Sequence, residues 1–201
     1  MARPREFDPD VALDAVMRLF WLQGFQGTSI DDLVRVTGMN RYSLYGVWGD
    51  KHALYLAAVR RYAESIGAEW MARLDASEDP LAGIREMFVA MSAAIAEDTS
   101  RHGCLALNTA LELGRHDDVA RGLVREILDA MQAAFERALV RARDLGQLAP
   151  GADPAVHARH LAVSFQAVLL QARNGAPRET VDAFVTVALS TLPEVSRCDV
   201  V

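Results

Sequence analysis

The sequence TSIDDLVRVTGMNRYSLYGVWGDKHAL, residues 28–54, decides the fold of this chain. Apolar residues recur in it at helical spacing, and glycines interrupt the pattern at Gly38 and Gly49. Gly38 supplies a sharp reversal, because glycine adopts a positive φ without steric penalty. The stretch therefore predicts two short helices joined by a tight turn and followed at once by the start of a longer helix.

Residues that cap helices stand where each of these helices begins. Thr28 and Asp31 fit a capping box, in which a hydroxyl and a carboxylate satisfy free backbone amides. Asn40 is a good cap for the second short helix, and Asp50 for a long helix over residues 51–74. The caps and the glycine turn together predict a helix-turn-helix.

The rest of the chain also has helical periodicity, without a sustained period of two. A helix over about residues 8–22 precedes the quoted stretch and is expected to end at Gly24. Later helices are expected over about residues 81–97, 103–113, 118–144, 154–173 and 178–192. We predict an all-α chain of about nine helices, with a three-helix helix-turn-helix domain over residues 1–50 and a larger helical domain over residues 51–201.

The second helix of a helix-turn-helix presents its N-terminal side chains to base edges in the major groove of DNA. Here those side chains are Arg41, Tyr42 and Ser43, which follow Asn40. Arg41 has the geometry to fork onto a guanine, and Tyr42 to meet a thymine methyl group or a phosphate. The pattern predicts base and backbone contacts from this segment.

Contacts to DNA phosphates are expected from the neighbouring helix ends. Thr28 and Ser29 stand at the start of the preceding helix, where free amides and a partial positive charge suit a phosphate. Lys51, the only lysine in the chain, adds a full charge at the start of the long helix. Tyr45 is placed to contact the DNA backbone.

The spacing of these residues resembles the DNA-binding domain of the TetR family of bacterial transcriptional regulators. The positions that match the family pattern are Thr28 or Ser29, Leu33, Gly38, Leu44, Tyr45, Lys51 and Leu54. Tyr42 stands where glycine is common, so contacts there are expected to differ from those of relatives. The resemblance implies a dimeric regulator, a repressor, that binds a palindromic operator in double-stranded DNA and is released by a small-molecule effector.

The resemblance also implies that the C-terminal domain binds the effector and forms a homodimer through the helices at 154–173 and 178–192. Two apolar stripes on these helices are compatible with such pairing: Leu161, Phe165, Val168, Leu169 and Ala172, and Val181, Phe184, Val185, Ala188 and Leu192. The alternative is that both stripes face the core of a single chain.

Six residues are expected to line the effector pocket: Trp70, Phe88, Met91, Cys104, Asn108 and Phe165. The pattern Gly-Cys-Leu…Asn…Glu-Leu over residues 103–113 resembles one branch of the family, in which it lies near the pocket. The apolar members fit an ordinary core equally well, and Asn108 and Glu112 fit local capping or pairing equally well.

Cys104 supports an alternative function, a thiol-based redox or electrophile sensor. A cysteine near a helix N-terminus, beside Arg101 and His102, has the surroundings that favour a thiolate. The opposing interpretation is a small buried residue that packs two helices together. An enzyme is not expected, because no third orienting residue or cofactor loop accompanies this pair, and no catalytic residue, cofactor or metal site is predicted.

The bulk composition limits how the chain can bind DNA. The net charge is −6, which is the wrong sign for a protein that coats nucleic acid. Binding is therefore expected from a few placed side chains and helix N-termini. The N-terminus lacks an apolar signal core, and no apolar run is long enough for a membrane span, so a cytoplasmic protein without membrane contact is expected.

Overall fold

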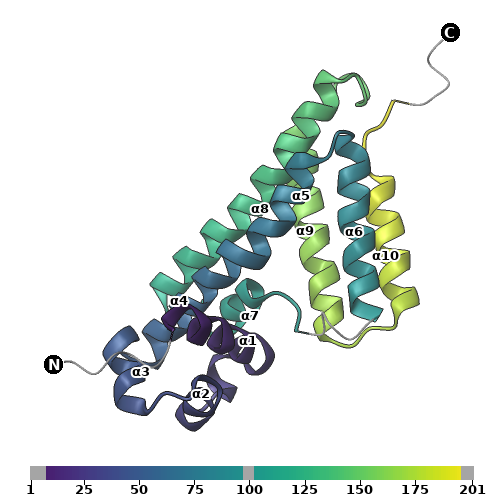
Figure 1. Cartoon of the computed structure of the whole chain (residues 1–201). Coiled ribbons are helices and arrows are strands. Elements are labelled where there is room, and N and C mark those ends of the chain that lie inside the picture. Colours follow the sequence, from purple (N-terminus) through teal and green to yellow (C-terminus); the bar gives the residue numbers. More distant parts are fainter. Residues whose placement is uncertain (1–7, 97–101, 196–201) are drawn as a thin grey trace. The chain divides into compact units, whose positions relative to one another are not determined.

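The computed structural model describes residues 8–96 and 102–195 and shows an all-α chain (Figure 1). The described helices are α1 (Pro9–Gly27), α2 (Ile30–Thr37), α3 (Arg41–Trp48), α4 (Lys51–Tyr62), α5 (Ala68–Ala76), α6 (Pro80–Ala96), α7 (Leu105–Glu112), α8 (Asp118–Asp144), α9 (Pro154–Arg173) and α10 (Arg178–Ser190). A π-helical turn, η1 (Ala63–Gly67), joins α4 to α5, so these residues form nine continuous helical runs. The predicted fold class is confirmed.

Backbone contacts divide the chain into two compact units. The first contains α1 to α4, α7 and the first turns of α8, and the second contains α5, α6, the rest of α8, α9 and α10. Helix α7 therefore belongs with the helix-turn-helix, although it lies far along the sequence. The predicted division into a DNA-binding domain over residues 1–50 and a second domain over residues 51–201 stays a prediction.

The core of the first unit forms where α1 packs on α4. The ring of Tyr55 meets Phe20 edge to face, with ring centroids 4.8 Å apart, and meets Phe25 at 5.1 Å. Leu33 from α2 and Leu44 from α3 are fully buried against this core. Each short helix is thus anchored by one large apolar side chain, and most of its other side chains are not buried.

The connection from α1 to α2 differs from the prediction, in which the first helix ended at Gly24 and Thr28 capped the second. Gly24 leaves the helical conformation, with φ 76°, but the chain returns to helix until Gly27. The Thr28 hydroxyl is buried and donates to the Gly24 carbonyl over 2.8 Å, so it is not free to cap α2. Ser29 and Asp32 form the capping box instead, and the predicted pair of Thr28 with Asp31 is wrong.

The predicted long helix from Lys51 to Leu74 is also interrupted. Regular α-helix ends at Tyr62, the π turn follows, and α5 continues to Ala76. Within the π turn the Ser65 hydroxyl donates to the Arg61 carbonyl over 2.6 Å. Such bonding back to the preceding turn competes with the regular helical hydrogen bonds and commonly bends a helix.

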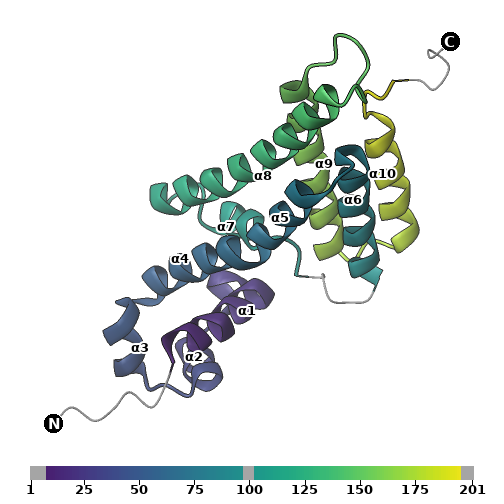
Figure 2. The same cartoon turned by 45° about the horizontal axis from the view of Figure 1, so that its top comes forward.

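The second unit is packed around aromatic rings. The Phe165 ring lies 5.3 Å from Phe88, 6.2 Å from Phe135 and 6.5 Å from Trp70, measured between centroids. Helices α6, α9 and α10 run side by side in both views (Figures 1 and 2). The four rings come from four helices and form the centre of this unit.

Both stripes that were considered for pairing face this core. The buried members are Leu161, Phe165, Val168, Leu169 and Ala172 on α9, Val181, Val185 and Ala188 on α10, and Leu192 just after α10. These residues are therefore buried within one chain, whereas Phe184 of the second stripe is only half-buried. A different set on α9 is exposed at seven-residue spacing: Val156, Val163 and Leu170.

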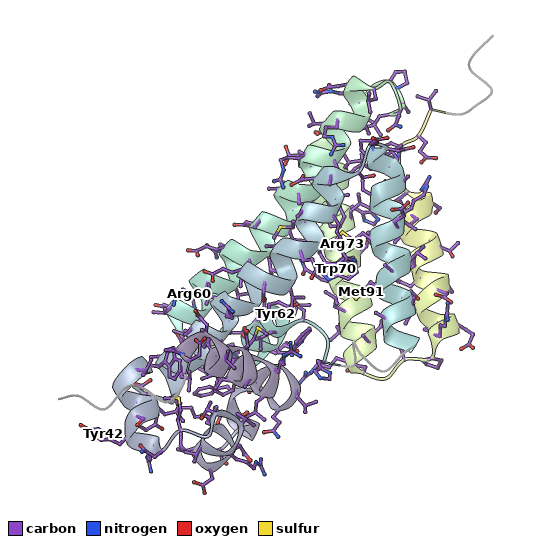
Figure 3. The ribbon with its side chains drawn as sticks, viewed as in Figure 1. Tyr42, Arg60, Tyr62, Trp70, Arg73 and Met91 are labelled. Atoms are coloured by element: carbon purple, nitrogen blue, oxygen red, sulfur yellow. The ribbon has the colours of Figure 1, made fainter. Side chains whose placement is uncertain are left out.

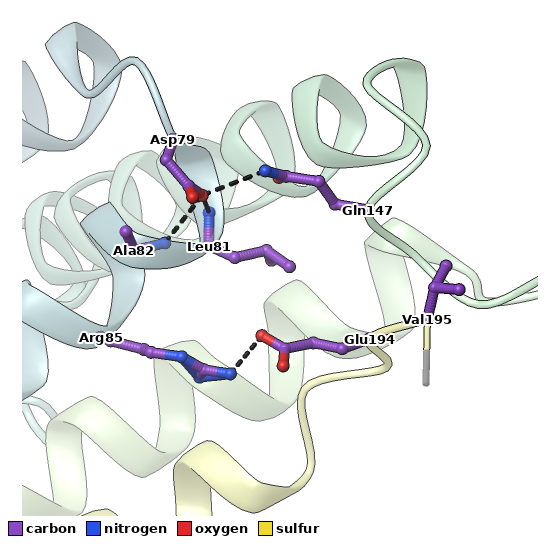
Figure 4. Close-up of a pocket in the computed structure, with 7 residues that line it drawn as sticks. All are labelled: Asp79, Leu81, Ala82, Arg85, Gln147, Glu194 and Val195. Carbon is purple, nitrogen blue, oxygen red and sulfur yellow. Dashed lines mark hydrogen bonds and ion pairs between the residues drawn. The ribbon is translucent and has the colours of Figure 1, made fainter. Parts of the chain in front are cut away.

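The end of the second unit is tied together by polar contacts (Figure 4). Glu194 pairs with Arg85 of α6, and the Val195 amide donates to the Gln147 carbonyl over 3.0 Å. Asp79 caps α6, and hydrogen bonds, chiefly that from the Ala82 amide, hold its pKa below the ordinary value. These residues border a hollow of about 370 Å³.

Two further findings concern residues 8–96 and 102–195. None of their helices combines the length and the apolar character that crossing a membrane requires. None of their His, Cys, Asp and Glu side chains gather in groups of three or more that would hold a metal ion.

Candidate nucleic-acid interface

The turn between α2 and α3 is fixed at both ends. Gly38 takes the left-handed conformation, with φ 67°, and its amide donates to the Val34 carbonyl over 2.9 Å. Met39 and Leu44 are buried and hold α3 in place. Only a residue without a Cβ adopts this φ at no steric cost, so Gly38 sets the angle between the two helices.

The N-terminal turn of α3 carries most of the predicted base-contacting side chains. The Asn40 carboxamide accepts the Ser43 amide over 2.8 Å and so caps the helix. The Arg41 guanidinium lies over the Tyr45 ring, 5.5 Å from its centroid. Tyr42 is 89% exposed and points away from the helix (Figure 3). An open, largely apolar hollow of about 630 Å³ is lined by Arg41, Tyr42, Tyr45 and Gly46.

The start of α2 combines exposed amides with carboxylates. The Ser29 amide donates to Asp32 over 3.0 Å, and the Asp32 amide donates to the Ser29 hydroxyl over 3.1 Å. The hydrogen bonds from Ser29 hold the pKa of Asp32 below its usual value, so this carboxylate stays charged. A phosphate at this helix end would therefore meet the amides of the first turn rather than the Ser29 amide.

Lys51 begins α4, as predicted, directly after the capping residue Asp50, which accepts the Ala53 amide over 2.7 Å. Its ammonium group lies over the Phe25 ring, 4.5 Å from the centroid. Burial lowers the pKa of Lys51, and the nearby Glu112 carboxylate opposes that shift. A partly desolvated cation at a helix N-terminus is a strong point of attraction for phosphate.

Three polar contacts hold α4 to its neighbours and were not foreseen from the sequence. Arg61 donates through Nε to Asp14 over 2.7 Å, His52 pairs with Asp117, and Tyr55 bonds Thr109 over 2.9 Å. Their partners lie up to 65 residues away. No local pattern links such positions, so sequence periodicity alone could not have identified them.

The structure separates the eight predicted DNA-contacting residues into two groups. Seven lie at or within the first turns of α2, α3 and α4: Ser29, Asn40, Arg41, Tyr42, Ser43, Tyr45 and Lys51. Thr28 differs, because its side chain is 1% exposed and its hydroxyl is bound to Gly24. Thr28 is thus a support for this corner of the first unit.

The predicted effector-binding residues are also divided. Trp70, Phe88 and Phe165 meet in the aromatic cluster of the second unit, and Met91 is buried on α6. Cys104 forms no disulfide and is 8% exposed, which fits a packing role. Asn108 is buried in the first unit. A hollow of about 160 Å³ between α5 and α6 is lined by Trp70, Arg73, Leu74, Gly83, Glu86, Met87 and Ala90.

Two family models match this chain. Residues 12–58 match a model described as "Bacterial regulatory proteins, tetR family". Residues 80–187 match one described as "Tetracyclin repressor-like, C-terminal domain". The first match contains the helix-turn-helix, and the second contains the aromatic cluster.

Curated relatives are similar over nearly the whole chain. The uncharacterised HTH-type transcriptional regulator YezE of Bacillus subtilis is 33% identical over 96% of this chain and all of the relative. The HTH-type transcriptional repressor ComR of Escherichia coli is 27% identical over 97% of this chain and 93% of the relative.

Solved structures extend the similarity to the arrangement of helices. A cysteine mutant of the TetR family regulator CifR, complexed with 26-bp double-strand operator DNA, is 28% identical, with a TM-score of 0.82 over 96% of this chain and all of that one. A TetR family regulator from Cytophaga hutchinsonii is 19% identical, with a TM-score of 0.80 over 96% of this chain and all of that one. The latter likeness concerns the fold alone.

Proposed function

We propose that this chain, which belongs to the TetR family of bacterial transcriptional regulators, is a dimeric repressor that a small-molecule effector releases from a palindromic operator. Family membership makes it a DNA-binding regulator. Repression, dimer geometry and effector release are the proposed parts. A repressor of this kind acts where the chromosome is, in the bacterial cytoplasm.

The exposed N-terminal turn of α3 is the observation that carries the proposal. Met39 and Leu44 are buried and anchor the helix to the first unit, while Arg41 and Tyr42 are exposed. A tyrosine that is 89% exposed gains nothing from the folded chain, but it offers an aromatic face and a hydroxyl to a groove. We infer that Arg41, Tyr42 and Ser43 read bases and that phosphates are held by Tyr45, by Lys51 and by the amides of the α2 turn that Ser29 caps.

DNA binding is tested by fluorescence anisotropy with the DNA upstream of the protein's own gene. Arg41→Ala is expected to weaken binding by about 1–3 kcal/mol if Arg41 forks onto a base. The matched control is Arg60→Ala, which removes the same charge from an exposed position on α4 (Figure 3). Equal affinities for wild type, Arg41→Ala and Tyr42→Ala would contradict the assignment of this surface.

Dimerisation is proposed through the exposed face of α9. Val156, Val163 and Leu170 are 58%, 59% and 45% exposed and recur every seven residues, the spacing of a helix-pairing seam. A charge at the middle position, Val163→Glu, is expected to give a monomer in analytical ultracentrifugation. Val89→Glu on α6 is the control, because Val89 is similarly exposed, at 57%. A dimer that persists in Val163→Glu would place the interface elsewhere.

Effector binding is proposed for the hollow between α5 and α6. Its wall combines Trp70 and Met87 with the charged Arg73 and Glu86, which suits a small ligand with one polar end. Compounds that raise the melting temperature of the wild-type protein should also release its operator. The same compounds should lose both effects in Trp70→Ala, and unchanged release would contradict this location.

The alternative thiol-sensor function receives less support from the structure. Cys104 is buried, whereas reactive cysteines are typically accessible and close to positive charge. The Cys104→Ser variant distinguishes the two functions. If oxidant releases DNA from the wild type but not from Cys104→Ser, thiol chemistry is the signal and the proposed effector mechanism is wrong.

A further inference from the structure

A carboxylate from α7 lies directly against the bend near the end of α1. The Gln26 amide donates to Glu112 Oε2 over 3.0 Å, across 86 positions of sequence. The other oxygen, Oε1, lies 2.2 Å from where a Cβ on Gly24 would stand. Glycine suits this position because of its φ of 76°, and a side chain there would displace the Glu112 carboxylate.

The bend that Glu112 occupies determines where α2 starts. At Gly24 the helix is interrupted, so backbone groups there need partners outside the helical pattern. Glu112 accepts the Gln26 amide, and the Thr28 hydroxyl donates to the Gly24 carbonyl over 2.8 Å. Ser29 caps α2 immediately afterwards. The two side chains thus hold the corner that leads into the helix-turn-helix.

The same carboxylate is also electrostatically close to the start of α4. Glu112 is near enough to Lys51 to oppose the lowering of its pKa, and the ammonium group lies over Phe25, a residue of the bend. Helix α7 is itself held to α4 by the bond between Tyr55 and Thr109. Glu112 therefore faces both elements that flank α3 along the chain, the α1–α2 corner and the N-terminus of α4.

We propose that Glu112 is a positioning residue for DNA binding, which fixes the α1–α2 corner and thereby the start of α2 and the placement of α3. The inference rests on the proposed function. It assigns the glutamate of the Gly-Cys-Leu…Asn…Glu-Leu pattern to the DNA-binding unit and not to the effector pocket. Movement of α7 would then change operator affinity through this one side chain.

The test compares Glu112→Ala with Glu112→Gln in anisotropy measurements on upstream DNA. Glu112→Ala leaves the Gln26 amide without its acceptor and should weaken binding about tenfold, the order expected for one hydrogen bond to a charged group. Glu112→Gln retains an oxygen that can accept the amide, so its affinity should return to within about threefold of the wild type. Glu126→Ala, an exposed glutamate on α8, is the matched control.

An NMR measurement separates positioning from general destabilisation. The Gln26 amide proton should shift upfield and exchange faster in Glu112→Ala, but not in Glu112→Gln. If Glu112→Gln loses as much affinity as Glu112→Ala, or if Glu112→Ala binds DNA like the wild type, the inference is overturned. If the wild type binds no upstream DNA, the proposed function fails. A Gln26 amide proton that still shifts in Glu112→Ala would then confirm the contact between Gln26 and Glu112 alone.

Discussion

The two compact units hold their helices together by different means. In the first, α2 and α3 have eight residues each and bury one large side chain apiece. Besides the packing of α1 on α4, polar contacts constrain these helices: the Ser29 and Asn40 caps, Tyr55 with Thr109, and Gln26 with Glu112. In the second, Trp70, Phe88, Phe135 and Phe165 fill the space between long helices.

The difference follows from what each unit has to do. A helix that presents most of its surface to DNA has little left to bury, so hydrophobic packing cannot fix its direction. Directional hydrogen bonds can do so with few atoms. The longer helices of the second unit bury four aromatic rings, and the volume that these rings fill fixes how the helices pack. Substitutions should therefore be costly for stability in the second unit and costly for DNA affinity in the first.

The largest effect on stability is expected from Phe165→Ala in the second unit. Phe165 is 3% exposed and touches three other rings, so truncation leaves a cavity that the long helices cannot close. The expected loss is about 3–5 kcal/mol of unfolding free energy, measured by urea denaturation. Phe165→Leu, which keeps most of the volume, should lose much less. A loss below about 1 kcal/mol for Phe165→Ala would show that this core is not packed around the rings.

A smaller loss of stability, with a clear effect on DNA binding, is expected from Asn40→Ala. Removing the cap frees the Ser43 amide and should destabilise the first unit by about 0.5–2 kcal/mol. Because the capped turn carries Arg41 and Tyr42, operator affinity should fall as well. Asn40→Ser keeps a capping oxygen and should restore both properties. If the operator affinity measured by anisotropy is unchanged in Asn40→Ala, the cap does not hold Arg41 and Tyr42 in place for DNA.

Much of the first unit could be predicted from the sequence because its signals are local. Gly38, Asn40 and Asp50 have the turn and capping roles that their types and spacing indicate. The error at Thr28 arose because the bend at Gly24 interrupts the helical pattern. The Thr28 hydroxyl is used by the carbonyl at the Gly24 bend, so the capping box moved to Ser29 and Asp32.

The contacts of the second unit were harder to predict from the sequence. Periodicity identified the apolar face of α9 correctly but could not say whether Phe165 faces its own chain or a second copy. That distinction depends on which other helices are near, and no repeat along α9 encodes it. Glu112 was ambiguous for the same reason, since its acceptor role depends on a bend far away in the sequence.

Tyr55→Phe tests whether a single directional bond matters in the first unit. Thr109 donates its own proton to the Leu105 carbonyl over 2.8 Å, so Tyr55 must donate to Thr109. Loss of this buried bond should lower the unfolding free energy by about 0.5–1.5 kcal/mol. A double-mutant cycle with Thr109→Val isolates the pair. Zero coupling in that cycle would mean that the α4–α7 contact is held by packing alone.

The smallest effect is expected from the charge of Lys51, and it depends on pH. Burial lowers the pKa of Lys51 below its ordinary 10.5, so the free protein loses this proton before an ordinary lysine would. The ammonium contribution to phosphate binding is complete below the lowered pKa and is lost as the pH rises through it. Between the lowered pKa of Lys51 and its ordinary value, the unfolded chain binds more protons than the folded chain. As the pH rises through this range, the free protein therefore becomes more stable, while its operator affinity falls.

Anisotropy at constant ionic strength between about pH 7 and 10 measures this loss, with Lys51→Arg as the matched control because arginine keeps its charge throughout. The wild type should lose affinity with rising pH more steeply than Lys51→Arg, since other titrating groups are common to both proteins. Equal slopes would show that Lys51 makes no charged contact with DNA. Phosphate binding by the first unit would then depend on helix ends and on its arginines, and the partly buried ammonium over Phe25 would act in packing.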